Sequence, residues 1–181
     1  MEILLREEQI KKRVEELGEA ITNDYRDKFP IFVGILKGAF VFLSDLLRNV
    51  KIDCEVDFMG TTSYNDSTHS SGIVRITYDL TLDIENRHVI IVEDVLDTGL
   101  TLEYICKTLS LRKPLSLRTC VLLKKDMPRK VSIEPDYVGF VIPNKFVIGY
   151  GLDYAGKYRN LPYIGVIDKK SPKIFQRYSI K

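Results

Sequence analysis

The chain is poor in cysteine, and this scarcity excludes two kinds of scaffold. Three cysteines, Cys54, Cys106 and Cys120, occur among 181 residues, with no CxxC pair and no other metal-binding spacing. The usual structural zinc sites and disulfide frameworks are therefore not expected. Each cysteine lies among apolar residues, so we expect buried free thiols. The odd number and the lack of a recognisable signal peptide point to a reducing, cytoplasmic environment.

An excess of charge and long hydrophobic runs are also lacking. The 27 basic and 25 acidic residues leave a net charge of +2, too small to argue for a nucleic-acid partner. The longest apolar stretches are interrupted by Lys37 or Asp45 and are too short to span a bilayer. Internal repeats and low-complexity segments are absent as well. We therefore expect one globular domain over residues 1–181, with no nucleic acid and no membrane as a partner.

Hydrophobic periodicity predicts an α/β fold. Helical spacing predicts helices over residues 7–25, from Gly38 to Leu47, and from about residue 100 to about Arg112. Strands are predicted at residues 31–36, 52–58, 73–78, 89–92, 117–123, 137–142, 146–150 and 163–167. Because strands alternate with helices through the middle of the chain, we expect a twisted, mainly parallel sheet flanked by helices.

One internal segment has no periodicity at all. Residues 60–72 are dominated by Gly, Thr, Ser, Asn and Asp. A polar stretch of this length inside a compact domain is typical of a lid or of a disordered segment. We therefore predict a long polar loop, from which the strand at 73–78 returns to make a flexible flap.

The most informative segment is VIIVEDVLDTGLTL, residues 89–102. A buried strand is followed at once by Glu93 and Asp94, then by Asp97, and then by a hydroxyl- and glycine-bearing turn that opens a helix. The free N–H groups of a first helical turn bind phosphate, and a glycine lets the backbone approach it closely. The carboxylates suit sugar hydroxyls or a divalent cation.

The segment also has a purely structural interpretation, because acids are common near helix N-termini. One acid would be explained in this way. Three acids within five residues repel one another, and their burial requires compensation, so a binding site is the stronger interpretation.

This segment resembles the 5-phosphoribosyl-1-pyrophosphate (PRPP) site of the type I phosphoribosyltransferases. A second segment, IPNKFVIGYGLDYAGKYRNLPYIGVI at residues 142–167, resembles the base-binding hood of those family members that act on 6-oxopurines. The resemblance implies a core over about residues 26–142. It also implies a small hood made of the N-terminal segment and about residues 143–181.

The family resemblance implies roles for particular residues. PRPP and its phosphates would be bound by Lys37, Gly38, Glu93, Asp94, Asp97, Thr98, Gly99, Leu100, Thr101 and Arg159. The purine would be bound by Lys125, Lys145, Phe146, Val147 and Asp153. Asp97 and Lys125 would be catalytic, Ser63 and Tyr64 would belong to the flap, and Glu93, Asp94 and Asp153 would bind Mg²⁺. The bond between Leu36 and Lys37 would be a cis peptide.

The same resemblance implies an activity, namely transfer of phosphoribose from PRPP to hypoxanthine or guanine by a homodimer or homotetramer. A cationic donor such as Lys145 suits a 6-oxygen and disfavours the amino group of adenine. Three alternatives stay open at this point. They are a PRPP-sensing regulator of the same fold that binds nucleic acid, an enzyme that also accepts xanthine, and an adenine or pyrimidine phosphoribosyltransferase.

Overall fold

The computed structural model describes residues 1–66, 69–128 and 131–167, and for residues 63–66 and 69–73 it describes the backbone alone. A six-stranded sheet in the order β4-β3-β2-β5-β6-β7 forms its centre. The strands are β2 (Ile31–Leu36), β3 (Glu55–Asp66), β4 (His69–Tyr78), β5 (His88–Leu96), β6 (Ser116–Asp126) and β7 (Tyr137–Pro143). All neighbours pair in parallel except β3 and β4. The predicted α/β fold with a mainly parallel sheet is confirmed.

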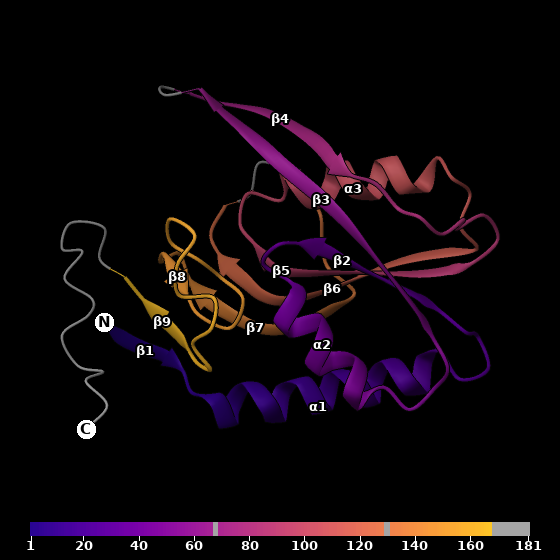
Figure 1. Ribbon diagram of the computed structural model, residues 1–181, viewed down its shortest axis with the longest axis horizontal. Coiled ribbons are helices and arrows are strands. Elements are labelled where there is room, and N and C mark those ends of the chain that lie inside the picture. The colour runs from indigo at the N-terminus through magenta and orange to yellow at the C-terminus, as the bar shows by residue number, and fades with distance from the viewer. Residues whose placement is uncertain (67–68, 129–130, 168–181) are drawn as a thin grey trace.

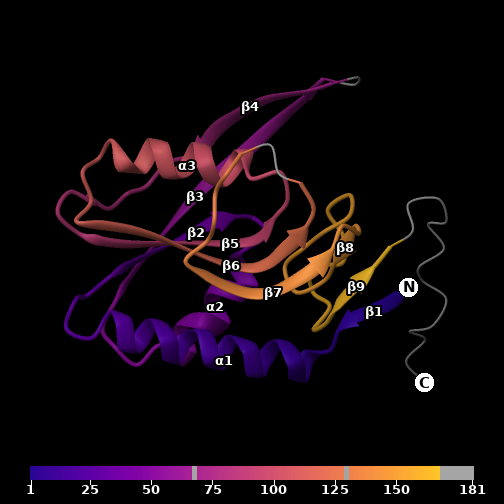
Figure 2. The ribbon, with the colours of Figure 1, turned by 180° about the vertical axis from the view of Figure 1, so that it is seen from behind.

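Helices cover both faces of this sheet (Figures 1 and 2). α1 (Glu7–Asp24) and α2 (Phe40–Asn49) pack on one face, and α3 (Leu100–Ser110) packs on the other. Because side chains on a strand alternate between faces, each central strand feeds two cores. In β5, Ile90 and Val92 belong to the core under α1 and α2, whereas Val89 and Ile91 belong to the core under α3.

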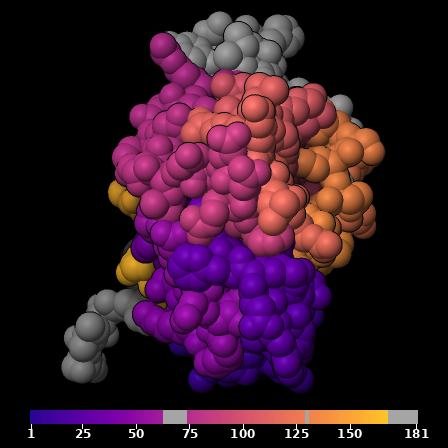
Figure 3. Space-filling model, turned by 90° about the vertical axis from the view of Figure 1, so that its right-hand side faces the viewer, coloured from indigo at the N-terminus to yellow at the C-terminus, as the bar shows by residue number. Residues whose placement is uncertain are grey.

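A small second sheet sits beside the carboxyl ends of the central strands. It has the order β1-β9-β8, with β1 (Glu2–Leu5), β9 (Ile164–Val166) and β8 (Val147–Ile148). The sequence did not predict β1, because four residues ahead of a helix carry too little pattern. Its pairing joins the start of the chain to the hood segment, with Glu2 opposite Val166. Figure 3 looks onto the opposite end of the molecule, where the parallel strands begin.

The prediction of a long polar loop at residues 60–72 is wrong for most of its length. β3 continues to Asp66 and β4 begins at His69, and the two form an antiparallel hairpin that projects from the sheet (Figure 1). A projecting hairpin has no face on the core, so it shows no apolar alternation, although Thr and Tyr favour strands. The predicted return strand at residues 73–78 is part of β4. The side chains of Ser63 and Tyr64 lie outside the described set.

Two smaller expectations also need comment. All three cysteines are free, as predicted, but only Cys120 is fully buried, whereas Cys54 and Cys106 are half-buried. Cys106 packs at the margin of the core under α3, and Cys54 packs at the margin of the core under α1 and α2. Among the described residues, no helix has both the length and the apolar character needed to cross a membrane.

Candidate active site

The acidic segment lies inside a strand and does not follow one. β5 continues through Glu93 and Asp94 to Leu96, and it pairs with β6 as far as Leu96 and Lys124. We expected the strand to end at Val92, because carboxylates rarely continue a buried strand. The continuation of the strand determines the directions in which the two carboxylates point. Successive side chains on a strand point to opposite faces, so Glu93 faces α3 and Asp94 faces α2.

The turn after β5 forms a small cavity at the start of α3. Gly99 precedes the helix with φ of 84°, in the left-handed region that side-chain-bearing residues avoid. A Cβ atom at this position would also lie 2.7 Å from Cγ2 of Val131. The cavity has a volume of about 60 Å³ and is lined by Glu93, Val95, Leu96, Asp97, Thr98, Gly99, Thr101 and Leu102. It therefore brings hydroxyl groups and a helix N-terminus together, which favours an anion.

Asp97 is held by a lysine from the neighbouring strand. Nζ of Lys125 lies 2.7 Å from Oδ2 of Asp97. The Lys125 side chain is 10% exposed, whereas that of Asp97 is 48% exposed. Lys125 therefore fixes one oxygen of a carboxylate that faces open space. The predicted proximity of these two residues is confirmed.

Glu93 is an unusual buried acid. It is 6% exposed, and within the described part of the chain its Oε2 atom has no hydrogen-bond partner. Burial, and to a lesser extent the charge of Asp94, raise the pKa of the Glu93 carboxyl to about 8. Burial also raises the pKa of Asp94 to about 6, although hydrogen bonds from backbone N–H groups and the charge of Arg159 oppose this rise. Such perturbed carboxyls are common at functional sites.

The raised pKa of Glu93 predicts a stability that depends on pH. The folded protein holds this proton up to about pH 8, whereas the unfolded chain releases it near 4.5. Between these values the folded state binds more protons, so stability should fall as pH rises, by up to about 1.4 kcal/mol per pH unit. In Glu93→Gln this contribution should vanish, and in the exposed control Glu19→Gln it should persist. Urea unfolding without substrate or metal, at several pH values, measures the difference; parallel profiles for wild type and Glu93→Gln would contradict it.

The loop after β2 meets Asp94 at very close range. The Leu36–Lys37 peptide is cis, as the family resemblance implies. A Cβ atom at Gly38 would lie 1.6 Å from Oδ2 of Asp94, so only glycine fits this position. A cavity of about 330 Å³ opens here, with walls of Lys37, Gly38, Asp94, Val95, Asp97, Lys125, Phe146, Val147, Leu152, Asp153 and Arg159.

The hood closes one side of this cavity with an internally bonded loop. Arg159 donates from Nη1 to the carbonyl oxygen of Gly151 at 2.6 Å, and its Nη2 lies 2.7 Å from Oδ1 of Asp153. The other carboxylate oxygen of Asp153 accepts a hydrogen bond from the Gly156 N–H at 2.7 Å. The structure therefore brings Asp153 and Arg159 to the cavity as a mutual ion pair.

A third cavity, of about 660 Å³, adjoins the other two. It is lined by Asp97, Lys125, Asn144, Lys145, Phe146, Val166 and Ile167. The Lys145 side chain is 45% exposed, and its Nζ lies 3.5 Å from Oε2 of Glu2. The Phe146 ring packs edge-to-face against Tyr154, with 5.7 Å between the centroids. This cavity therefore combines a cation, an aromatic ring and the Asp97–Lys125 pair.

The three cavities share walls and form one continuous site, named the β5 cleft below. Asp97 lines all three, and Lys125 and Phe146 each line two. All predicted site residues in the described part border the cleft except Leu100, which begins α3. Sequence reasoning missed Val95, Leu96, Leu102, Asn144, Leu152, Val166 and Ile167. Asn144 adjoins Lys145 in the quoted motif and was within reach, whereas the apolar residues show no chemical signal in sequence.

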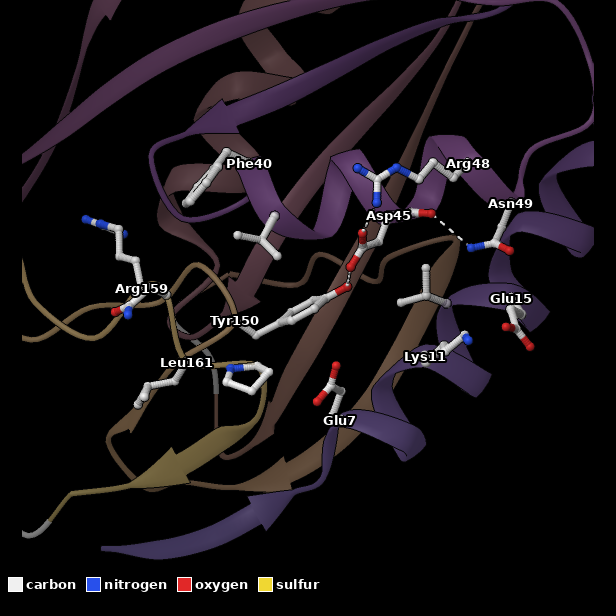
Figure 4. Close-up of a pocket in the computed structure, with 14 residues that line it drawn as sticks. Glu7, Lys11, Glu15, Phe40, Asp45, Arg48, Asn49, Tyr150, Arg159 and Leu161 are labelled. Carbon is white, nitrogen blue, oxygen red and sulfur yellow. Dashed lines mark hydrogen bonds and ion pairs between the residues drawn. The ribbon is translucent and has the colours of Figure 1, made fainter. Parts of the chain in front are cut away.

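A separate cavity of about 630 Å³ lies between α1, α2 and the hood (Figure 4). Within it the Tyr150 hydroxyl donates to Oδ2 of Asp45 at 2.7 Å, which ties the hood to α2. It shares Arg159 with the β5 cleft, but neither Asp97 nor Lys125 lines it. Its contacts therefore support the hood and do not extend the β5 cleft.

Comparison with known proteins is consistent with this geometry. Residues 1–155 match the phosphoribosyl transferase domain family. The chain belongs to this family.

Its relatives include particular enzymes. The chain is 48% identical to the hypoxanthine-guanine phosphoribosyltransferase of Bacillus subtilis, an alignment that covers 91% of this chain and 92% of the relative. It is similar to the crystal structure of a hypoxanthine phosphoribosyltransferase from Staphylococcus aureus, with a TM-score of 0.89, 48% identity, and 94% and 92% of the two chains covered. A solved hypoxanthine-guanine-xanthine phosphoribosyltransferase is 39% identical, with a TM-score of 0.85 and 93% and 98% covered.

Proposed function

We propose that the protein transfers the 5-phosphoribosyl group from PRPP to N9 of hypoxanthine or guanine, giving IMP or GMP and pyrophosphate. This is a reaction of purine salvage. The observation that carries the proposal is the continuous β5 cleft, in which a phosphate-sized cavity and a lysine- and phenylalanine-lined cavity meet at Asp97.

PRPP would lie along the carboxyl ends of β2 and β5. The N–H groups and hydroxyls of Thr98–Thr101 would bind the 5′-phosphate, and Lys37, Gly38 and Arg159 would bind the pyrophosphate. Asp94, which lies between these two groups, would accept hydrogen bonds from the ribose hydroxyls. Glu93 does not point towards the ribose hydroxyls in this arrangement, because its side chain faces α3. Its burial supports a role in shaping the phosphate cavity.

The purine would stack on Phe146, with Lys145 donating a hydrogen bond to its 6-oxygen. Backbone groups of Val147 and Asp153 would bind the opposite edge. Asp97 would act as general base at N7 while N9 attacks C1′ of the sugar. Lys125 holds Oδ2 of Asp97 in place, so Oδ1 is the atom proposed to take the proton. The developing charge on the sugar makes positioning and electrostatics the main source of rate enhancement.

Mg²⁺ is the proposed cofactor. Within residues 1–66, 69–128 and 131–167 no group of three or more His, Cys, Asp or Glu side chains is placed to hold a metal ion. Mg²⁺ is usually bound by one or two carboxylates together with substrate phosphates and water, so Asp94 fits a site completed by PRPP. Glu93, the other acid proposed to bind the ion, lies on the opposite face of β5 and does not point to the same site. When bound, the ion would neutralise charge on the departing pyrophosphate. Asp153 fits a second such site only if its ion pair with Arg159 opens.

An assay with PRPP, Mg²⁺ and one base at a time tests the proposal. We expect product with hypoxanthine and guanine and none with adenine or uracil. Product with xanthine as well would show that the enzyme accepts three bases. That alternative is supported by the similarity to a solved hypoxanthine-guanine-xanthine phosphoribosyltransferase. No turnover with any base, together with tight RNA binding, would favour the regulator instead.

Lys145→Ala should separate base recognition from PRPP binding. The Lys145 hydrogen bond reaches only the purine, so kcat/KM for hypoxanthine should fall by about 10-fold to 100-fold while the dissociation constant of PRPP stays within about twofold. Lys157→Ala, an exposed lysine of the same loop region, is the matched control. Equal losses for the base and for PRPP would contradict the assignment.

Three further proposals concern the whole protein. We propose a single domain over residues 1–181, a cytoplasmic location, and assembly into a homodimer or homotetramer. Sedimentation velocity of the full chain tests the assembly, and a monomer at working concentrations would contradict it.

A further inference from the structure

A fifth cavity lies at the end of the sheet opposite the β5 cleft. It has a volume of about 250 Å³ and is lined by Asp24, Tyr25, Lys28, His88, Ser116 and Arg118. His88 and Ser116 open β5 and β6 and are register partners. The cavity therefore belongs to the end at which the parallel strands begin, the end that faces the viewer in Figure 3. We name it the α1–β6 cavity.

Strand alternation explains why polar side chains gather there. Ile90 and Val92 of β5 and Cys120 and Leu122 of β6 belong to the core under α1 and α2. The same faces of both strands continue outward to His88, Ser116 and Arg118, beyond the apolar part of α1. Three polar side chains are thus presented where the core ends. The last residues of α1 and the loop after it form the opposite wall.

The clearest sign of a ligand is the hydroxyl of Tyr25. This residue is 3% exposed, and within residues 1–66, 69–128 and 131–167 its hydroxyl has no hydrogen-bond partner. Burial raises the pKa of the Tyr25 phenol, and the nearby Ser116 side chain lowers it by a smaller amount as a weak hydrogen-bond partner, at a geometry outside that of a formed hydrogen bond. However, the Ser116 hydroxyl is bonded to Nδ1 of His88 at 2.7 Å. A buried hydroxyl without a partner is unfavourable, so Tyr25 has a donor to offer an incoming group.

The charges around the cavity favour an anion. Lys28 and Arg118 are both exposed cations of the wall, and Arg118 forms a long ion pair with Asp136, with 3.8 Å between Nη1 and Oδ1. The one carboxylate of the wall, Asp24, already accepts a hydrogen bond from the Tyr137 hydroxyl at 2.5 Å. Burial and the charge of Lys28 lower the pKa of His88, as expected in a positive environment.

One feature opposes an anion, namely the carboxyl end of α1, where helix carbonyl groups carry partial negative charge. Lys28 reduces this effect, because its Nζ donates to the carbonyl oxygen of Asp24 at 2.6 Å. An ammonium group has three donors, so two remain for a ligand. The balance therefore favours binding: two cations and two neutral donors, namely the Tyr25 hydroxyl and the one proton left by the His88–Ser116 hydrogen bond, face two carboxylates, Asp24 and Asp136, that already accept hydrogen bonds.

We propose that the α1–β6 cavity binds a phosphate group, either as free phosphate or as the phosphate of a small phosphomonoester. Lys28 and Arg118 provide the charge, and the Tyr25 hydroxyl and one member of the hydrogen-bonded His88–Ser116 pair provide further donors. The site is separate from the β5 cleft and is not needed for the proposed reaction. The volume of the cavity leaves space beside the phosphate for a small organic group. A small phosphomonoester would therefore fill more of the cavity than free phosphate does.

Proton NMR of the histidine rings tests the proposal with inorganic phosphate and with methyl phosphate as separate ligands. The chain contains two histidines, His69 and His88, so His69 on β4 is an internal control. At constant ionic strength and pH, we expect added phosphate to shift the His88 ring signals in a saturable way. In a pH titration at saturating phosphate, we expect the pKa of His88 to rise by about one unit. Phosphate held in the β5 cleft lies at the other end of β5 and should not produce this shift. A linear shift, or one equal to that of His69, would overturn the proposal. Tighter binding of methyl phosphate would identify the phosphomonoester as the ligand, and tighter binding of inorganic phosphate would identify the free ion.

Three variants of the cavity and one control variant outside it sharpen the test. Lys28→Gln and Arg118→Gln should each weaken phosphate binding by roughly tenfold, whereas Arg26→Gln, an exposed neighbour outside the cavity, should have no effect. Tyr25→Phe should weaken binding without lowering the melting temperature of the ligand-free protein, because its hydroxyl has no partner there. Unchanged affinity in both charge variants, or a lower melting temperature for Tyr25→Phe, would contradict the site.

Discussion

Asp97→Asn is expected to lower kcat by about 10²- to 10⁴-fold, with PRPP binding nearly unchanged. The amide keeps an oxygen that can accept the hydrogen bond of Lys125, so the local geometry should persist. What it loses is the ability to take a proton from the purine. Steady-state kinetics with hypoxanthine, together with the dissociation constant of PRPP, measure the two effects separately.

Asp126→Asn is the matched control for this variant. Asp126 is an exposed acid at the end of β6, directly after Lys125, and it borders none of the cavities that form the β5 cleft. Its replacement should leave kcat within about twofold, because exposed charges are weakly coupled to a site. If Asp97→Asn also kept near-normal turnover, Asp97 would not be the general base.

Gly38→Ala is expected to cause the second large loss, by displacing Asp94. The new methyl group would lie where Oδ2 of Asp94 now is, since a Cβ atom would meet it at 1.6 Å. Either the carboxylate or the Lys37–Gly38 loop must move. Misplacement by about 1 Å of groups that position a substrate costs on the order of 100-fold, so kcat/KM for PRPP should fall by about that factor.

A double variant tests the cause of that loss. The clash at Gly38→Ala should also lower the free energy of unfolding. Asp94→Ala removes the clashing carboxylate, so the double variant should regain much of that stability, although its activity stays low. If Gly38→Ala bound PRPP normally, or if Asp94→Ala gave no recovery of stability, the close contact would not explain the glycine.

The sequence predicted the parts of the fold that rest on buried periodicity. The alternation of strands and helices gave the parallel sheet, and the apolar run at Val89–Val92 located its central strand. It did not predict that β5 continues through Glu93 and Asp94. A buried strand is expected to end where charged residues begin, and this expectation fails where a site requires buried acids. The sequence predicted a flap with a returning strand, but not that β3 extends to Asp66 and β4 begins at His69, because residues 60–72 carry no apolar alternation.

The candidate site was more predictable than the fold boundaries. Motif residues such as Asp97, Lys125 and Lys145 come from separate segments, and the sequence placed the first two at strand carboxyl ends; the structure makes those strands neighbours. Their chemistry is visible in sequence, whereas the ion pair of Lys145 with Glu2 is not. That contact depends on β1, which pairs with β9 across nearly the whole length of the chain.

The most direct test of the account is a crystal structure of the protein with GMP. The proposal predicts the 5′-phosphate against the N–H groups of Thr98–Thr101, with the guanine ring on Phe146 and its 6-oxygen within hydrogen-bond distance of Nζ of Lys145. A nucleotide bound with its base outside the hood, or with its phosphate away from the start of α3, would contradict the claim that one cleft holds both sugar phosphate and purine.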